Sequence, residues 1–466
     1  TPAKIKIGYA PTRRSIFSAP AAIEYRNLTA DRLRELGVDF VDITDINKEG
    51  LLYDDNDLPA IVEKFKAEKV DGIFFPHGNF GTEYESQDCQ GNESSGSALG
   101  PAMNVPIPKP RPPEDSQCGL FATGKVLRRF RVPFTYMTNC NLTDPEFERG
   151  IKDFLAVCNI VRTFRHTRIL QISTRPFDFW STMCNEGELL EKFNIQLSPV
   201  PMTELVQNVN KAKEEKTLVE ACVAYMRMKM DIHVTEDELY NVAATKVAIE
   251  TMAKKYGCNA AVIQCWNALQ DELGVMPCCA NSLLFDEGFP VVCETDIHGA
   301  ITSLLIQAAG MDEHPVFFAD WTVRHPTNDN AELLQHCGPW PLSLAKERPQ
   351  LTYPLAFDYP GAVAAECKHG NVTLCRFDGD NGEYSLLLGT AKGIDGPYTK
   401  GTYLWVEVKN WKKLEAKIVE GPYIHHCAGI HGDVVARLYE ACKYIGVKPD
   451  LYDDNDEEIK AYLRGE

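Results

Sequence analysis

The feature that most constrains the fold of this sequence is an alternation of short apolar runs and helical patterns over its first 165 residues. Residues 5–9 and 70–75 are apolar runs of strand length, and residues 21–36 between them have helical apolar spacing that ends at Gly37. This β-α-β-α order predicts a parallel sheet covered by helices. We therefore predict a Rossmann-like α/β domain over residues 1–165.

A second Rossmann-like α/β domain is predicted over residues 166–345. Its expected strands recur in the same rhythm, at residues 168–172, 260–265, 290–293 and 316–319. The longest helical patterns between them are at residues 203–230 and 235–256. A length of 466 residues supports several domains, because one hydrophobic core rarely serves so long a chain.

The sequence changes character after about residue 345. Alternating runs separated by Gly and Asp turns follow one another at residues 371–377, 383–390, 401–408 and 414–419. Short strands joined by such turns are typical of antiparallel sheets. We predict a mainly antiparallel β domain over residues 346–466, closed by a helix at residues 433–445.

Residues 87–116 interrupt the pattern and are rich in Gly, Ser, Asn and Pro. Loops of this length inside compact domains are usually functional or mobile. The segment is therefore predicted to be a lid, a subunit contact or an ordered surface excursion, and the sequence does not choose among these.

Charge and cysteine content restrict the class of protein. The chain has 48 Lys and Arg against 66 Asp and Glu, a formal charge of −18, which opposes binding to nucleic-acid phosphates or anionic lipid. Its 16 cysteines are scattered without a C-x-x-C pair, as in cytosolic proteins with reduced thiols. Neither a signal-peptide pattern nor an apolar stretch of membrane-spanning length is present. We expect a cytoplasmic protein with no nucleic-acid or membrane partner.

Two carboxylates are candidate metal ligands because each directly follows an apolar run. Glu294 follows residues 291–293, and Asp320 follows residues 316–319 as the predicted end of its strand. Ligands gather at the carboxyl ends of strands in parallel sheets, and two neighbouring carboxylates repel unless a cation or shared proton lies between them. The alternative for Glu294 is a helix cap.

Histidines offer further ligands. The pair His425-His426 occupies a Gly- and Ala-rich turn between a predicted strand and the last predicted helix, and neutral imidazole binds metals well. His336, in the sequence Leu-Gln-His-Cys-Gly, is an additional candidate.

These segments resemble the metal-binding segments of the L-fucose and L-arabinose isomerases. The Glu-Thr-Asp stretch at Glu294 is similar to the family's Glu-x-Asp stretch with the first ligand, and the Asp-Trp-Thr stretch at Asp320 is similar to the segment with the second. The His-His pair is similar to a C-terminal pair whose second histidine, here His426, binds metal. His336 aligns with a further ligand of the arabinose branch. The opening Ile-Gly-Tyr-Ala-Pro-Thr-Arg-Arg, at residues 7–14, also resembles this superfamily.

The sequence departs from both branches in ways that leave the substrate open. It is shorter than a typical L-fucose isomerase. It has Ala319-Asp320 where the arabinose branch has Glu-Asp, so that Asp320 is the carboxylate, as in the fucose branch.

The resemblance implies a metal-dependent aldose–ketose isomerase that interconverts an open-chain aldose and its 2-ketose through an enediol. Its substrate would be a small sugar similar to L-fucose or L-arabinose. A divalent cation, Mn²⁺ or otherwise Co²⁺ or Mg²⁺, would be held by Glu294, Asp320 and His426, with His336 as a further ligand. Glu294 and Asp320 would act as base and acid, in an order that the sequence does not fix.

The resemblance also implies a homo-oligomer, a trimer or a hexamer, in which the N-terminal domain completes the site of a neighbouring subunit. Several side chains at predicted strand ends are candidates for contact with the sugar. They are Arg14, His77, Asn79, Gln264, Trp321 and His336. Trp180 and Trp340 are further candidates for stacking, with core packing as the alternative.

Three other functions compete with this interpretation. The first is isomerisation of an anionic hexose such as sulfoquinovose, because the forked guanidinium group suits oxyanions. The arginines in question are Arg13, Arg14, Arg175 and Arg324. The second is a non-catalytic sugar-binding protein, and the third is a metal-dependent hydrolase or aldolase.

Overall fold

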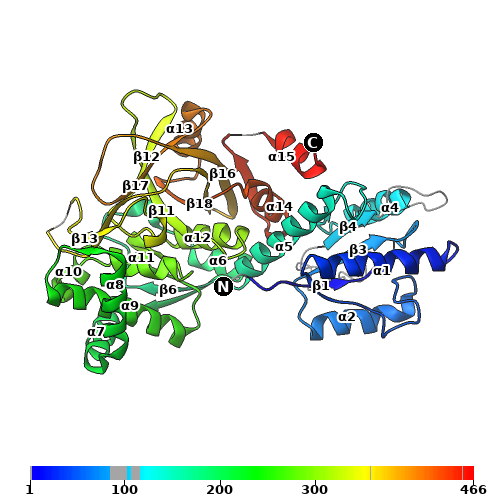
Figure 1. The fold of residues 1–466 in the computed structure, drawn as a ribbon, viewed down its shortest axis with the longest axis horizontal. Coiled ribbons are helices and arrows are strands. Elements are labelled where there is room, and N and C mark those ends of the chain that lie inside the picture. Colours follow the sequence, from blue (N-terminus) through cyan, green and yellow to red (C-terminus); the bar gives the residue numbers. More distant parts are fainter. Residues whose placement is uncertain (1–2, 84–101, 107–115, 357, 454) are drawn as a thin grey trace. The chain divides into compact units, whose positions relative to one another are not determined.

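The computed structural model describes residues 3–83, 102–106, 116–356, 358–453 and 455–466 (Figure 1). The chain forms two compact units. The small unit comprises residues 2–162, 436–446 and 456–466, and the large unit comprises residues 163–435 and 447–455. Among the helices of the described ranges, none is long and apolar enough to cross a membrane.

The small unit is built on a five-stranded parallel sheet in the order β2-β1-β3-β4-β5. The strands are β1 (Lys6–Tyr9), β2 (Asp39–Val41), β3 (Gly72–His77), β4 (Ala102–Pro106) and β5 (Thr135–Tyr136). Its helices include α1 (Ala19–Glu35), α2 (Leu58–Ala67), α4 (Ser116–Arg129) and α5 (Pro145–Arg165). Helix α2 buries Ile61 and Phe65, and a Cβ atom on Gly8 would lie 2.8 Å from the Phe65 ring, so the glycine lets this helix approach β1 closely.

The C-terminal end of the chain returns to the small unit. Helices α14 (Val435–Ile445) and α15 (Asp456–Arg464) flank strand β19 (Lys448–Leu451), which belongs to the large unit. Thr135 donates a hydrogen bond to Glu440 over 2.8 Å, and Arg437 pairs with Asp153 over 2.7 Å. The predicted final helix at 433–445 is therefore confirmed in position but is followed by a further strand and helix.

A four-stranded parallel sheet in the order β10-β9-β6-β7 forms one layer of the large unit. The strands are β6 (Arg168–Ile172), β7 (Gln196–Val200), β9 (Ala260–Ile263) and β10 (Val291–Val292). The helices are α6 (Glu186–Phe193), α7 (Met202–Glu215), α8 (Thr217–Lys229), α9 (Glu236–Tyr256), α10 (Ala268–Leu273), α11 (Cys278–Asp286) and α12 (Ile297–Ala309).

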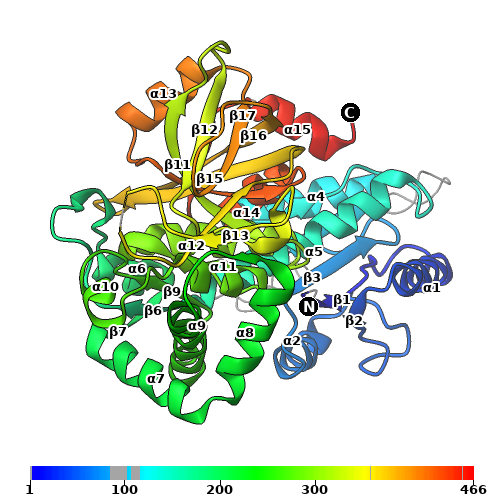
Figure 2. The same ribbon diagram turned by 60° about the vertical axis from the view of Figure 1, so that its left-hand side comes forward.

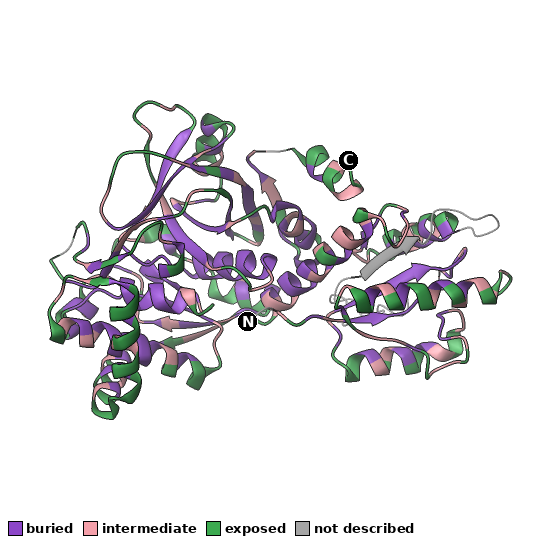
Figure 3. Ribbon diagram, viewed as in Figure 1, coloured by how far each residue is buried: buried purple, intermediate pink, exposed green. Residues whose placement is uncertain are grey.

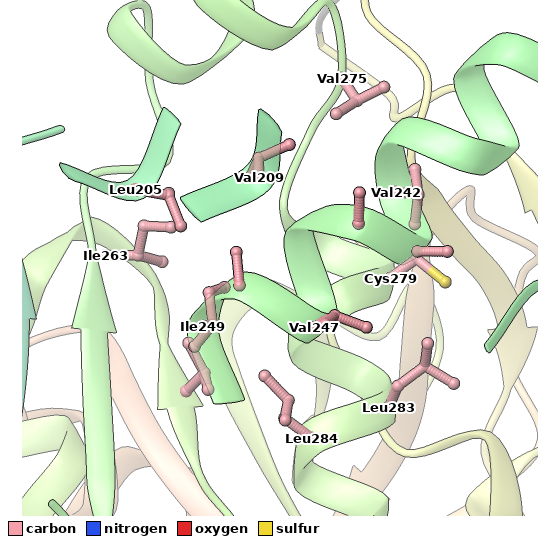
Figure 4. Close-up of a cluster of buried hydrophobic side chains, with 14 of the residues drawn as sticks. Leu205, Val209, Val242, Val247, Ile249, Ile263, Val275, Cys279, Leu283 and Leu284 are labelled. Atoms are coloured by element: carbon pink, nitrogen blue, oxygen red, sulfur yellow. The ribbon is translucent and has the colours of Figure 1, made fainter. Parts of the chain in front are cut away.

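The core of this layer lies between α7, α9, α11 and β9 (Figure 4). Leu205, Ile249 and Ile263 are fully buried there. A capping box fixes the start of α9, because Thr235 accepts from the backbone of Glu238 and the Glu238 side chain accepts from the backbone of Thr235.

The second layer of the large unit is a ten-stranded sheet in the order β19-β16-β15-β18-β11-β12-β17-β14-β13-β8. An additional pairing of β16 with β17 closes six of these strands into a mainly antiparallel barrel. The barrel strands are β11 (Val316–Arg324), β12 (Ala331–His336), β15 (Asn371–Asp380), β16 (Glu383–Ile394), β17 (Thr402–Glu407) and β18 (His426–His431). The short strands β8 (Asp231–Ile232), β13 (Gln350–Thr352) and β14 (Ala362–Glu366) extend it.

Helix α12 joins the two layers. It contacts β9 and β10 of the parallel sheet and β11, β15 and β18 of the barrel, and Figure 2 shows the barrel strands on one side of it and α7, α8 and α9 on the other. All of its residues are buried (Figure 3). This explains why the helix is apolar around its whole circumference.

The predicted architecture of parallel α/β sheets and an antiparallel β part is present, whereas several predicted elements are wrong. Residues 414–419 belong to helix α13 (Trp411–Glu420), because Asn410 caps a run of good helix formers. Residues 102–106 of the predicted loop form β4, while residues 87–101 and 107–115 lie outside the described residues. Strands β11 and β12 already belong to the barrel, and the three domain ranges stay predictions.

Candidate metal centre

Four side chains of the large unit bring potential ligand atoms together. The Nε2 atom of His426 lies 3.1 Å from Oε2 of Glu294 and 3.4 Å from Oδ1 of Asp320. The Nε2 atom of His336 lies 3.6 Å from the same Glu294 oxygen and 3.8 Å from the same Asp320 oxygen. Two imidazole nitrogens and two carboxylate oxygens thus surround one small volume.

Strand pairing in the barrel explains three of these positions. Strand β11 lies between β18 and β12, and Asp320 is directly opposite both His426 and Gln335. His336 is the next residue on β12. The prediction that Asp320 ends its strand is wrong, because β11 continues to Arg324, with a register shift between Trp321 and Arg324. His426 begins β18 rather than lying in a turn.

Glu294 reaches the centre from the parallel sheet. It lies in the 3-10 turn η3 (Cys293–Thr295) between β10 and α12, where sequence alone placed it. Glu294 has φ 54° and Thr295 has φ 53°, so two consecutive residues with side chains are left-handed. Such backbone costs about 1–3 kcal/mol per residue and persists where the surroundings enforce it, which is common at functional sites.

The centre contains buried polar atoms without partners. Oε2 of Glu294, Oδ1 of Asp320 and the Nε2 atoms of His336 and His426 have no hydrogen-bond partner among the described residues. Leaving a buried polar atom unpaired is costly, and here four such atoms converge. The donor set, two imidazoles and two carboxylates, fits a divalent cation such as Mn²⁺ or Zn²⁺.

The electrostatics also favour a bound cation. Burial raises the pKa of Glu294, but attraction to the nearby His336 and His426 outweighs it and holds the net pKa well below its usual range. Burial raises the pKa of Asp320 to about 6. For His426 burial lowers the pKa, but the hydrogen bond to Asp296 and the neighbouring Glu294 carboxylate outweigh it and raise the pKa to about 9. The carboxylates thus draw protons onto the histidines, and a divalent cation would take their place.

A second group of polar residues behind His426 was not predicted as a site. Asp296 accepts a hydrogen bond from His426 Nδ1 over 2.8 Å and from the backbone N–H of Gly299 over 3.0 Å. Arg376 of β15 donates to Asp296 Oδ1 over 3.1 Å and to Asp378 over 2.9 Å. The resemblance drew attention to the Glu-x-Asp stretch, whereas no local signal marks Arg376.

Thiols border the centre on another side. Sγ of Cys265 lies 3.9 Å from Oε1 of Glu294, and Sγ of Cys337 lies 3.3 Å both from His336 Nδ1 and from Sγ of Cys278. All described cysteines are free.

Aromatic rings form further walls. Phe179 stacks at 6.1 Å on His426 and contacts Trp266 edge-on at 5.3 Å, and Phe318 packs against His426 at 4.8 Å. His425 lies beside His426, and burial lowers its pKa to about 4.

The remaining predicted substrate residues of the large unit have different surroundings. Gln264 follows β9 and accepts a hydrogen bond from Ser173 over 2.9 Å. Trp321 is half-buried against Trp411, and its indole nitrogen has no hydrogen-bond partner among the described residues. Trp340 is a core residue that packs on Phe317 at 4.5 Å, which is the core packing that the sequence offered beside stacking on a sugar.

The predicted residues of the small unit gather at the carboxyl ends of β1 and β3. His77 Nδ1 lies 2.8 Å from the Thr12 hydroxyl, and Asn79 accepts from the backbone of Arg14 over 3.0 Å. The Arg14 side chain lies over Phe80 and pairs with Glu83 over 2.5 Å. Arg13, in turn, forms a two-bond pair with Glu49.

The two other arginines considered for an anionic substrate differ from each other. Arg324, at the far end of β11, lies near Asp329. Arg175 follows β6 and donates to the backbone carbonyls of Pro176 and Phe177, with no carboxylate partner in the described part of the chain. Trp180, in the same loop, is 69% exposed.

Comparison with known proteins gives concordant matches. Residues 8–165 match the N-terminal domain of fucose/sulfoquinovose isomerases, and residues 336–452 match the C-terminal domain of L-fucose isomerase. Sulfoquinovose isomerases of Priestia aryabhattai and Priestia megaterium are each 22% identical over 460 residues, 95% of this chain and 98% of theirs. A sulfoquinovose isomerase of Alkalicoccus urumqiensis is 23% identical over 338 residues, 70% of this chain and 74% of its own.

Proposed function

Since this chain belongs to the L-fucose isomerase family of aldose–ketose isomerases, we propose that it interconverts an anionic aldohexose, of the sulfoquinovose kind, and the corresponding 2-ketose. The observation that carries the proposal is the convergence of four unpaired, buried ligand atoms from Glu294, Asp320, His336 and His426. A sugar-binding protein has no need of such a set, whereas metal-dependent isomerisation uses it directly.

We propose that these four residues hold the family's divalent cation, with Mn²⁺ as the preferred ion. A cation held there would act as a Lewis acid, polarising the oxygens of the reacting sugar and lowering the cost of the enediolate charge. His336 is included because its Nε2 atom faces the same two carboxylate oxygens as that of His426.

The two carboxylates divide the proton transfers. Glu294, whose pKa is depressed, remains ionised and is the proposed base that removes the proton from C2 of the aldose. Asp320, whose side chain is 29% exposed, is the proposed acid that donates a proton to O1. Return of the proton to C1 and removal of the O2 proton complete the 2-ketose, with no net change in atoms.

The anionic substrate is proposed on two grounds. The relatives that align over most of this chain are named sulfoquinovose isomerases. Among the four arginines considered from sequence, Arg175 is without a carboxylate partner in the described residues, and its loop touches the turn that carries Glu294, since Thr295 donates to the Thr174 carbonyl over 3.1 Å. A guanidinium free of carboxylates suits a sulfonate or phosphate group.

The proposal is tested by a turnover screen of the metal-stripped protein, with and without added Mn²⁺. The panel contains sulfoquinovose, glucose 6-phosphate, L-fucose, L-arabinose, D-arabinose and L-rhamnose, with ketose formation as the readout. We expect Mn²⁺-dependent ketose from an anionic sugar. Ketose from a neutral sugar alone would contradict the anionic substrate, and the absence of ketose from every sugar would contradict the proposed reaction on this panel.

We also propose a cytoplasmic homo-oligomer, a trimer or hexamer, in which Arg14, His77 and Asn79 of the small unit complete a neighbouring subunit's site. These three residues lie together at strand ends, where ligands of parallel sheets bind. Sedimentation equilibrium measures the assembly directly, and a monomer would contradict this part of the proposal.

A further inference from the structure

A buried chain of hydrogen-bonded polar side chains leads from His426 into the interior of the large unit. His426 Nδ1 lies 2.8 Å from Asp296, and Arg376 bridges Asp296 and Asp378. The chain ends at His298, whose Nδ1 lies 2.8 Å from Asp378. No step of the proposed isomerisation uses Asp296, Arg376, Asp378 or His298.

The Asp296 carboxylate accepts hydrogen bonds from three residues. Its Oδ1 accepts from the Gly299 backbone and from Arg376, and its Oδ2 accepts from Arg376 and His426. An ionised carboxylate can only accept hydrogen bonds, so the shared proton must be on Nδ1 of His426. In a neutral imidazole the other nitrogen, Nε2, then presents its lone pair, and this is the atom that faces Glu294 and Asp320.

We propose that Asp296 is a positioning residue that fixes His426 in the one tautomer able to bind the cation, and that Arg376 holds the Asp296 carboxylate in place from its far side. The inference rests on the proposed metal site. It assigns a role to two residues that touch neither substrate nor cation.

The Asp296 carboxylate is closely packed. The Asp296 side chain and the Arg376 side chain are each 1% exposed. A Cβ atom on Gly299 would lie 2.5 Å from Asp296 Oδ2 and 2.7 Å from the Phe318 ring, so only glycine leaves room for the carboxylate. The carboxylate also caps the start of α12, a fully buried helix. The group that contacts His426 is therefore held in place by this helix as well.

The substitution Asp296→Asn tests whether Asp296 orients the His426 imidazole or acts only through its negative charge. An amide nitrogen in place of Oδ1 would oppose two donors, Gly299 and Arg376. An amide nitrogen in place of Oδ2 opposes Arg376 alone and can donate to His426 Nδ1 instead. The second arrangement is therefore preferred, and it moves the imidazole proton to Nε2, where it blocks metal binding.

The matched control is Asp378→Asn, which removes the same charge from the other side of Arg376 without contact with His426. Calorimetric titration of the metal-free full-length protein with MnCl₂ compares both variants with His426→Ala. We expect Asp296→Asn to weaken Mn²⁺ binding at least about tenfold and Asp378→Asn to change it less than about threefold. In a His426→Ala background, Asp296→Asn should have no further effect.

Each result has a distinct meaning. Unchanged Mn²⁺ affinity in His426→Ala would overturn the proposed ligand, and the inference with it. Weakened binding in His426→Ala beside unchanged binding in Asp296→Asn would overturn the inference alone, and so would equal losses in Asp296→Asn and Asp378→Asn. If Asp296→Asn does not fold, Asp296→Asn/Arg376→Gln removes the opposite charges together. Retained Mn²⁺ affinity in that double variant would likewise overturn the inference.

Discussion

The Nε2 atom of His426 lies 3.1 Å from Oε2 of Glu294, although the two residues belong to different layers of the large unit. Glu294 comes from the turn after a parallel strand, and His426 begins a barrel strand. Neither atom has a hydrogen-bond partner among the described residues. The candidate centre is therefore a junction between the parallel sheet and the barrel.

The first prediction concerns this pair. In Glu294→Ala the centre loses the carboxylate that faces both histidines, so we expect Mn²⁺ affinity to fall by more than about 100-fold, since loss of a residue that merely supports a ligand costs about 10–100-fold. Ketose formation should fall with it. Metal content after dialysis and turnover give the measurement. Glu272→Ala, on the exposed surface of α10, is the control that should retain both, and full activity in Glu294→Ala would remove the proposed site.

The second prediction distinguishes the histidines. His336 presents an unpaired Nε2 to Glu294 and Asp320, whereas His425 packs against Phe179 and His426. We therefore expect His336→Ala to weaken Mn²⁺ binding at least about tenfold and His425→Ala to leave it nearly unchanged. Calorimetry of both variants tests this. A larger loss of Mn²⁺ affinity in His425→Ala than in His336→Ala would indicate that His425, rather than His336, is the ligand.

Much of the parallel α/β architecture can be predicted from this sequence because its signals are local. An apolar run followed by a carboxylate marks the turn after β10, and the cap of α9 is visible as Thr-Glu-Asp-Glu. Residues 414–419 were wrongly predicted to be a strand, because alternation of apolar and polar residues over six positions fits both a strand and one face of helix α13.

The barrel geometry could not be predicted in the same way. That Asp320 lies opposite His426 depends on the pairing of β11 with β18, which are far apart in the sequence. Arg376 is 1% exposed in the middle of a strand, and only the placement of Asp296 and Asp378 on either side explains how its charge is tolerated there. Such relationships arise from tertiary structure alone.

A third prediction concerns the cation and stability. Because the ligands come from two layers, a bound cation should stabilise the large unit by about 2.7 kcal/mol when its free concentration is a hundred times its Kd. Thermal unfolding of the metal-stripped protein should shift to higher temperature on addition of Mn²⁺. The shift should disappear in Glu294→Ala, and an equal shift in that variant would place the binding elsewhere.

A fourth prediction addresses the substrate. If Arg175 binds the anionic substituent, Arg175→Gln should raise KM for the sulfonated hexose at least about tenfold, the cost of losing one charge-assisted hydrogen bond, with a smaller effect on kcat. Arg168→Gln is the matched control, because Arg168 is at the opposite end of the same strand, β6. Equal effects on charged and neutral sugars would contradict a role in charge recognition, and Arg14→Ala would then be the next variant to compare.

The last prediction concerns pH and a carboxyl group away from the metal centre. Glu332 of β12 is 4% exposed, and its Oε2 has no hydrogen-bond partner within the described ranges. Burial raises its pKa to about 7, and Arg324, opposite it on β11, offsets only part of this. The folded protein therefore holds this proton more tightly than the unfolded chain, in which the pKa is about 4.5. The free energy of unfolding must then fall as the pH rises from about 4.5 through 7, by about 1–3 kcal/mol.

Glu332→Gln removes this dependence because the amide stays neutral. We expect the variant to exceed the wild type in stability at pH 8 by about 1–3 kcal/mol and by much less at pH 5, where the wild-type carboxyl is protonated in the folded state. Urea unfolding at the two pH values measures the difference. Glu347→Gln, at an exposed position, should show the same difference from the wild type at both pH values. A Glu332→Gln variant that is less stable than the wild type at pH 8 would show that the carboxylate is ionised and paired in the folded protein.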